Sequence, residues 1–318
     1  MISRRLKIQC QRQASEHRHG VQRSAFPLPL RPLPLAPPSG WLRNCGVLGT
    51  IAVLSLFAIG GCRSVPELAV DQRPAAYTAE PYAAVLEAAV VDGLVDYAAI
   101  VGDVRHQLDR YLYALATYGP ETTPDAFPTE AHRHAYHLNA YNALMLRLWL
   151  DKGAAEAGPD ASVGWLTWFV TERFPLDGGS TTLHHLEQSV IRPTYEEPRD
   201  HFALVCGAIS CPPLLGEPFA AERLDDQLES LGRRWLNEPD GLTLVDGEPR
   251  MSRIFKWYRD DFDLAGMGGL TGVVRRYVRA GNPRREAALK ALADDDLDFL
   301  GYDWTINSPA AALESGER

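Results

Sequence analysis

Apolar residues recur at helical spacing through much of the chain. The pattern is clearest over roughly residues 103–117 and 130–151. In the first segment the apolar positions three or four apart are Leu108, Tyr111, Leu112 and Leu115. The second segment follows Pro128-Thr129 and is apolar nearly all round after Ala140, which predicts a helix at the centre of the fold.

Three further helices are predicted from caps and spacing. Thr182 is placed to cap a short helix through Ile191, because its hydroxyl can accept a hydrogen bond from the first turn. Leu and Trp residues at helical spacing predict a helix over roughly 219–237, and Ser252 begins a helical stretch through Phe262.

Few segments have the character of strands. Leu242 to Val245 lead into Asp246-Gly247, which predicts a strand entering a tight hairpin. Residues 201–206 and 297–304 are the other predicted strands. Together these elements predict a single, helix-rich α+β domain around a small, mostly antiparallel sheet.

The amino-terminal region has the pattern of an export signal. Gly46 to Gly61 is an apolar run of sixteen residues after Arg43, and the sequence then reaches Cys62 as the lipobox of a bacterial lipoprotein does. A membrane-spanning helix needs about 20 residues. Residues 1–61 are therefore predicted to be a leader and signal peptide with Cys62 acylated, and an uncleaved anchor is the alternative.

Composition divides the chain into further segments, beginning within the leader. Residues 1–42 include a Pro-rich stretch without periodic pattern, for which we expect disorder or a start codon assigned too far upstream. Residues 62–80 are predicted to be a lipid-anchored tether, 81–310 one domain and 311–318 a disordered tail.

Setting the leader apart changes the charge. The whole chain has a formal charge of −9, to which residues 1–61 contribute +7, so the remainder carries −16. Such a surface repels phosphate backbones, which argues against nucleic acid as a partner. Resemblance to known lipoproteins, with Arg63 rather than Asp after Cys62, implies attachment to the outer membrane through Cys62, facing the periplasm. The other expected partner is an envelope ligand, or a small-molecule or peptide substrate.

The segment HFALVCGAISCPP, residues 201–213, holds the clearest candidate chemistry. Cys206 and Cys211 are the two cysteines that an exported, acylated chain would leave free. Gly207 allows a sharp turn between them, and the apolar run before Cys206 favours a strand that feeds a loop.

Five blocks in order along the chain resemble the domain of unknown function 547 family. They are residues 91–100 (VDGLVDYAAI), 135–146 (AYHLNAYNALML), 181–214, 253–262 (RIFKWYRDDF) and 302–307 (YDWTIN). The resemblance implies a domain over roughly 80–310 whose family has no settled activity. The chain departs from the family pattern at His137-Leu138, where members usually carry Trp-Ile, and at Gln188, where they usually carry His.

One hypothesis is an activated thiol at Cys206. In a regular strand His201 would point to the opposite face about 16 Å away, so it could not pair with this cysteine. His184 or His185 on the preceding helix are then the nearest bases, with Glu187 as an orienting carboxylate.

Asn139 and Asn142 lie three apart on the predicted central helix. They could orient an imidazole or donate to an oxyanion, or only form hydrogen bonds in a buried packing site. With an activated Cys206, assisted by His184, His185 or His201, this set predicts a hydrolase or acyl transferase acting on an amide or thioester. The Cys/His inventory loosely resembles papain-like and transglutaminase-like folds.

A disulfide between Cys206 and Cys211 is the alternative, because an exported protein meets oxidising conditions. It predicts a noncatalytic ligand-binding or scaffold protein. Inert buried thiols stay open, while a zinc site is disfavoured because Cys-x4-Cys is a weak ligand pattern.

The remaining motifs favour a scaffold without a cofactor. The sequence has no Gly-rich phosphate loop, GxSxG elbow, HExxH or dinucleotide fingerprint, so neither a cofactor nor a metal is predicted. The aromatic residues of 255–262 and 302–306 have the spacing of side chains packed in a core, and Asp260-Asp261 is interpreted as ordinary solvated charge.

Overall fold

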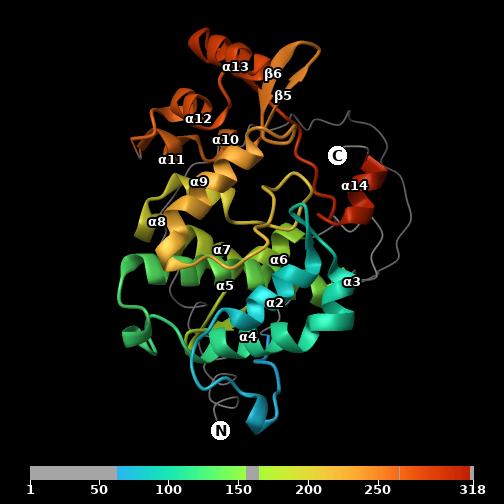
Figure 1. Ribbon diagram of the computed structural model, residues 1–318, viewed down its shortest axis with the longest axis vertical. Helices are drawn as coiled ribbons and strands as arrows, with labels where there is room; N and C mark the ends of the chain where they lie inside the picture. The colour runs from blue at the N-terminus through green and yellow to red at the C-terminus, as the bar shows by residue number, and fades with distance from the viewer. Residues whose placement is uncertain (1–62, 155–164, 265, 316–318) are drawn as a thin grey trace, which may run out of the picture.

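The computed structural model describes residues 63–154, 165–264 and 266–315 (Figure 1). At its centre is α5 (Glu130–Asp151), which confirms the predicted central helix. The hydroxyl of Thr129 accepts a hydrogen bond from the backbone of His132 and so caps the helix. Nearly every side chain of α5 after Leu138 is buried, because other elements cover the helix on most sides.

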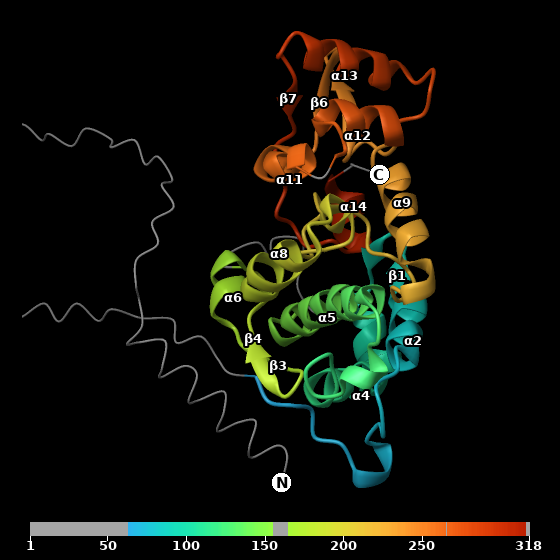
Figure 2. The same ribbon diagram turned by 90° about the vertical axis from the view of Figure 1, so that its left-hand side faces the viewer.

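Two helices pack beside α5 at one end of the molecule. They are α2 (Glu80–Ala89) and α4 (Arg105–Thr117), and α4 confirms the amphipathic helix predicted over 103–117. Figures 1 and 2 both show them next to α5. The Tyr82 ring stacks on Tyr111 at 4.8 Å between centroids. The short elements here are β1 (Val90–Val91), β2 (Leu94–Val95) and α3 (Tyr97–Ala99).

After α5 the chain forms a series of short elements. They are α6 (Trp165–Thr171), β3 (Phe174–Leu176), β4 (Gly179–Thr181), α7 (Leu183–His185), a π-helical turn over Leu186–Ile191, and α8 (Arg192–Tyr195). Thr182 accepts a hydrogen bond of 3.0 Å from the backbone of His185, which confirms the predicted cap. Leu183 and Leu186 anchor this stretch in the core.

The last third of the chain builds most of the other end of the molecule, although its final helix packs Ala312 beside Leu94 of β2. Its elements are α9 (Leu224–Trp235), β5 (Leu242–Val245), β6 (Glu248–Met251), α10 (Ile254–Trp257), α11 (Arg259–Leu264), α12 (Gly269–Tyr277), α13 (Pro283–Ala293), β7 (Asp298–Phe299) and α14 (Pro309–Ser315). Phe202 packs against the rings of Trp235, Phe255, Phe262 and Tyr277. This contact joins the two ends of the molecule in one hydrophobic core.

The largest sheet has three strands in the order β5-β6-β7. β5 and β6 form an antiparallel hairpin across Asp246-Gly247, as predicted, and β7 adds to β6 in parallel. β1–β2 and β3–β4 are separate antiparallel hairpins. The predicted helix-rich α+β fold is therefore confirmed.

The strand predicted over residues 201–206 is wrong. Pro198–Phe202 form a 3₁₀ helix, and the chain continues to Cys206 as irregular backbone. The side-chain amide of Asn142 donates to the carbonyl of Ala203 at 2.9 Å and accepts from the backbone of Val205 at 3.0 Å. A carboxamide offers the same donor and acceptor as a peptide group, so here one side chain takes the place of a neighbouring strand.

Both ends of the described chain contact the domain. Arg63 pairs with Asp151 at 2.7 Å and with Glu172 at 3.2 Å, so the start of the 62–80 segment packs against the domain. Residues 311–315 belong to α14, in which Ala311 is buried. The leader predicted over 1–61 and the acylation site Cys62 lie outside the described residues.

None of the helices just described could cross a membrane. Within 63–154, 165–264 and 266–315, the structure contains no helix that is both long enough and apolar enough to span a bilayer.

Candidate functional site

A cavity of about 150 Å³ lies beside the bond between Cys206 and Cys211. It opens to solvent next to Trp257, which is 48% exposed. We call it the Glu187 cavity, after the carboxylate in its wall. Its lining residues are Tyr141, Phe169, Val170, His184, Glu187, Gln188, His201, Leu204, Cys206, Cys211, Ile254, Trp257, Tyr258, Tyr302 and Trp304.

The two cysteines form a disulfide on one side of this cavity. Their Cα atoms are 6.4 Å apart, within the usual range for such a bond. The hydroxyl of Tyr302 lies 3.3 Å from the sulfur of Cys206 and 3.2 Å from that of Cys211. Cys206 is thus a half-cystine with no free thiolate in this state.

Helix α5 fixes the backbone that carries the disulfide. Besides the contacts of Asn142, the amide of Asn139 donates to the carbonyl of Phe219 at 2.9 Å and accepts from its N–H at 2.8 Å. Both Asn side chains are buried and do not line the Glu187 cavity. Their amides position backbone, and the structure gives neither of them the imidazole or oxyanion contact proposed from the sequence.

Glu187 is held inside the cavity by hydroxyl and amide donors. Its Oε2 accepts from the Tyr141 hydroxyl at 3.1 Å, and its Oε1 accepts from the Tyr258 hydroxyl and from Gln188 Nε2, both at 2.7 Å. Burial first, and the nearby carboxylate second, raise the pKa of Tyr141 and Tyr258 well above the ordinary value. Both phenols therefore stay protonated and donate to Glu187 at neutral pH.

A second charged group stands behind the cavity wall. His201 Nε2 lies 2.6 Å from Asp261 Oδ2, and Arg192 makes a two-pronged ion pair with the same carboxylate at 2.8 and 2.7 Å. Burial acts to raise the pKa of Asp261, but the hydrogen bonds from His201 and Arg192 outweigh it and hold that pKa well below its usual range. The His201 ring stacks on Tyr258 at 3.9 Å, so its position is fixed on both sides.

The structure brings several of the predicted site residues together. Cys206, His184, His201 and Glu187 line one cavity. The predicted separation of His201 from Cys206 assumed a regular strand over 201–206, and the structure has no strand there. Among the described residues, however, no histidine is hydrogen-bonded to Cys206, whose sulfur contacts Tyr302 instead. His185 is exposed and is absent from the lining.

Aromatic residues assigned to the scaffold in fact line the cavity. Trp257, Tyr258, Tyr302 and Trp304 all face it, and Asp261, interpreted as a solvated charge, holds His201. Periodicity could not identify them, because spacing predicts which residues share a face but not what that face covers. Gln188, which departs from the family pattern, also lies in the wall and supplies a donor to Glu187.

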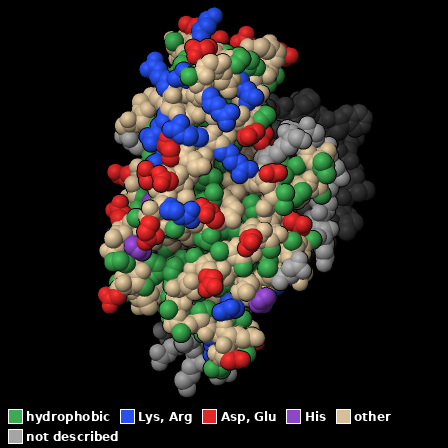
Figure 3. Space-filling model, viewed as in Figure 1, with side chains coloured by type: hydrophobic (Ala, Val, Ile, Leu, Met, Phe, Trp, Pro, Cys, Tyr) green, Lys and Arg blue, Asp and Glu red, His purple; other side chains and the backbone are tan. Residues whose placement is uncertain are grey.

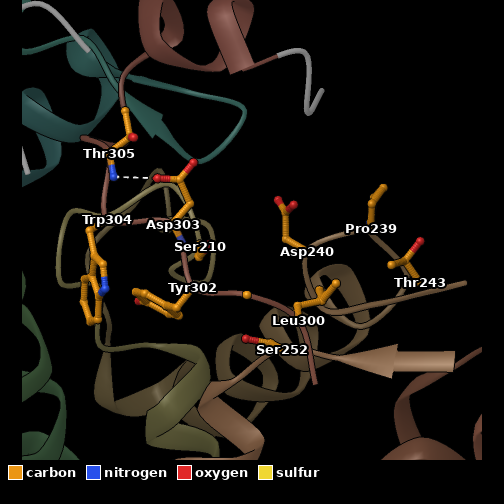
Figure 4. A pocket seen from close by; sticks show the side chains of 11 residues that line it. Ser210, Pro239, Asp240, Thr243, Ser252, Leu300, Tyr302, Asp303, Trp304 and Thr305 are labelled. Atoms are coloured by element: carbon orange, nitrogen blue, oxygen red, sulfur yellow. Dashed lines mark hydrogen bonds between the residues drawn. The ribbon is translucent and has the colours of Figure 1, made fainter. Parts of the chain in front are cut away.

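A larger hollow of about 730 Å³ adjoins the Glu187 cavity and shares Tyr302 and Trp304 with it. Figure 4 shows these two rings side by side and turned away from Asp240 and Thr243. The Ser210 hydroxyl accepts from the backbone of Asp303 at 2.9 Å, which ties the disulfide loop to the aromatic segment. Tyr302 and Trp304 therefore form a partition between the two hollows.

Charge is unevenly spread around these features. Figure 3 shows hydrophobic side chains at the surface across the middle of one face, while Lys and Arg side chains gather toward the end that holds α12 and α13.

In the parts of the chain that the structure covers, no three His, Cys, Asp or Glu side chains are grouped as a metal site would need.

The fold and the site define a helix-rich α+β protein whose small cavity is walled by aromatic rings and a disulfide. Residues 126–236 match the family described as "Protein of unknown function, DUF547", which confirms the predicted resemblance over this part of the chain. No curated protein and no solved structure matches the chain. The likeness to papain-like and transglutaminase-like folds stays a prediction.

Proposed function

We propose that this protein is a noncatalytic ligand-binding protein of the bacterial cell envelope, with the Glu187 cavity as its binding site. The observation that carries the proposal is the disulfide, which removes the free thiol that catalysis would need while the cavity beside it stays open. Concave sites with apolar walls and a few fixed polar groups are typical of small-molecule binding.

The proposed compartment agrees with the same bond. Disulfides persist in oxidising surroundings such as the periplasm, where a lipoprotein acylated at Cys62 and attached to the outer membrane would lie. In the producing bacterium, wild-type protein should fractionate with the outer membrane and Cys62→Ala should not. Mass spectrometry of the mature amino terminus checks the acyl group directly, and a wild-type protein without it would disprove the anchor.

Binding can be tested without knowing the natural ligand. Oxidised full-length protein is titrated by calorimetry with a panel of benzene-sized neutral, anionic and cationic probes. At least one should bind saturably, and Trp257→Ala should weaken it about tenfold by removing a large contact surface. Because Trp257 is half exposed, this change should leave the melting temperature nearly unchanged. Leu244→Ala, at another exposed apolar residue, is the control. If no probe binds, or if binding ignores Trp257, the proposal fails.

A second candidate is a cysteine-dependent hydrolase or acyl transferase that works only after reduction. It is favoured by one observation, the presence of Cys206, His184 and His201 in the same cavity. A reductant would have to convert the disulfide to two thiols before the Cys206 thiolate could attack an amide or thioester carbonyl. Turnover of a phenyl thioester by reduced wild-type protein, lost in Cys206→Ser, would support this function over binding alone.

A further inference from the structure

The wall of the Glu187 cavity has the electrostatics of a cation site. Among the described residues that line it, Glu187 is the one carboxylate, and there is no Lys or Arg. The neighbouring Arg192 is neutralised by its two-pronged pair with Asp261. A positively charged ligand group would therefore meet an opposite charge and no like charge from Lys or Arg in the lining.

Aromatic rings form a large part of the cavity lining that such a group would touch. Trp257 lies with its centroid 4.8 Å from Tyr302 and 5.8 Å from Trp304, and Tyr302 lies 4.1 Å from Trp304. Tyr141 and Phe169 contribute further rings at 6.5 Å from each other. Ring faces carry negative partial charge and attract cations within about 6 Å of their centroids.

Tyr258 plays a different part from the other rings. The imidazole of His201 stacks on it at 3.9 Å, and the guanidinium of Arg192 lies 5.0 Å from its centroid. Because these groups already occupy the ring, it contributes its hydroxyl to Glu187 rather than a face to the ligand. The other aromatic rings in the lining are those of Trp257, Tyr302 and Trp304, with Tyr141 and Phe169.

The hydrogen bonds of Glu187 select the kind of cation. Its two oxygens already accept from Tyr141, Tyr258 and Gln188, so the carboxylate has little remaining acceptor capacity. A primary ammonium has three N–H donors that need acceptors when water is removed. A quaternary ammonium has none, and is held by charge and by ring faces alone.

We infer that the Glu187 cavity binds a quaternary ammonium group of the trimethylammonium type, an inference that rests on the proposed binding function. A cavity of about 150 Å³ accepts a group roughly the size of benzene, so a head group of this kind fits it. The ligand is named by this chemistry alone, since a free solute and a phospholipid head group carry the same cation.

The test compares matched probes by calorimetry on oxidised full-length protein. The probes are choline, its uncharged isostere 3,3-dimethylbutan-1-ol, and ethanolamine. Choline should bind about tenfold or more tightly than either of the others, because cation–π attraction and the carboxylate both act on its permanent charge. Phosphocholine and dihexanoylphosphatidylcholine, at concentrations below micelle formation, then distinguish a free solute from a lipid source.

Two variants locate the effect. Glu187→Gln should weaken choline binding at least about fivefold and leave the affinity for the uncharged isostere unchanged, since the substitution keeps the shape of the side chain and removes its charge. Glu87→Gln, at an exposed position of α2 that does not line the cavity, should change neither affinity. Trp257→Ala should lower the affinity for choline more than the affinity for the isostere, because the lost ring face attracts charge in addition to excluding water.

The outcomes separate this inference from the binding function. If the isostere binds as well as choline, the cavity is a plain apolar site and the inference fails while the binding function stands. Preference for ethanolamine, or binding of an anionic probe alone, would also overturn the inference and leave the binding function intact. If no probe of any charge binds, the proposed function fails together with the inference.

Discussion

The indole nitrogen of Trp149 donates a hydrogen bond of 3.0 Å to the carbonyl of Cys206, at the point where the chain turns toward Cys211. The turn itself needs Gly207, whose φ of +87° lies in the region that side chains disfavour. Helix α5 thus holds the disulfide segment by the backbone, through Trp149 at one position and Asn142 at another.

This relationship makes Gly207 sensitive to substitution. A Cβ at that position would overlap the Trp149 indole, so Gly207→Ala should lower the free energy of unfolding by about 3 kcal/mol, from the clash and the positive φ together. Gly247→Ala is a matched control, because Gly247 has the same φ of +87° in open space. Urea denaturation should show the larger loss for Gly207; equal losses would mean that the Trp149 contact contributes nothing.

Removing the Asn142 amide should be costly for a different reason. Asn142→Ala leaves the carbonyl of Ala203 and the N–H of Val205 without partners in the core, which should lower stability by about 3 kcal/mol. Asn282→Ala removes an amide that caps α13 near solvent, and should cost about 1 kcal/mol. A loss at Asn142 no greater than that at Asn282 would contradict a role for this amide in holding the core backbone.

The disulfide should contribute stability but not ligand affinity. It links residues five apart, and closing so short a loop is expected to add about 2 kcal/mol to the free energy of unfolding. The double variant Cys206→Ala/Cys211→Ala should lack this contribution. Reductant should destabilise the wild type by a similar amount and leave the double variant unaffected. Thermal denaturation with and without reductant measures both effects, and a wild type indifferent to reductant would show that the bond is absent in solution.

His137 should make the fold sensitive to mild acid. Burial lowers its pKa from 6.5 to about 4, and its Nδ1 is hydrogen-bonded to the Tyr195 hydroxyl at 2.6 Å. Between these two pKa values the unfolded chain binds a proton that the folded chain does not, so stability falls as the pH falls from 6.5 to 4. The expected loss from this group is about 3 kcal/mol.

Replacing His137 should remove that part of the pH dependence. Denaturation of His137→Gln at about pH 7 and about pH 4.5 should show a smaller difference than the wild type shows. His106→Gln, at an exposed position of α4, should keep the wild-type difference. If all three proteins lose the same stability on acidification, His137 is not the buried neutral group that the structure indicates.

The sequence by itself predicted the elements whose signals are local. Helix α5, the Thr182 cap and the β5–β6 hairpin across Asp246-Gly247 follow from spacing, a hydroxyl cap and turn residues, each of which acts within a few positions of the chain. The resemblance to the DUF547 family was also available from the sequence, because ordered motifs need no coordinates.

Tertiary structure decided what those signals could not reach. The run at 201–206 has the apolar character of a strand, yet Asn142 from α5 supplies its hydrogen bonds and no sheet forms there. The sequence left Cys206 open between a thiol and a disulfide, and the turn at Gly207 brings Cys211 within bonding distance. The Glu187 cavity depends on packing most of all, because side chains from Tyr141 to Trp304 meet there and no pattern along the chain relates residues so far apart.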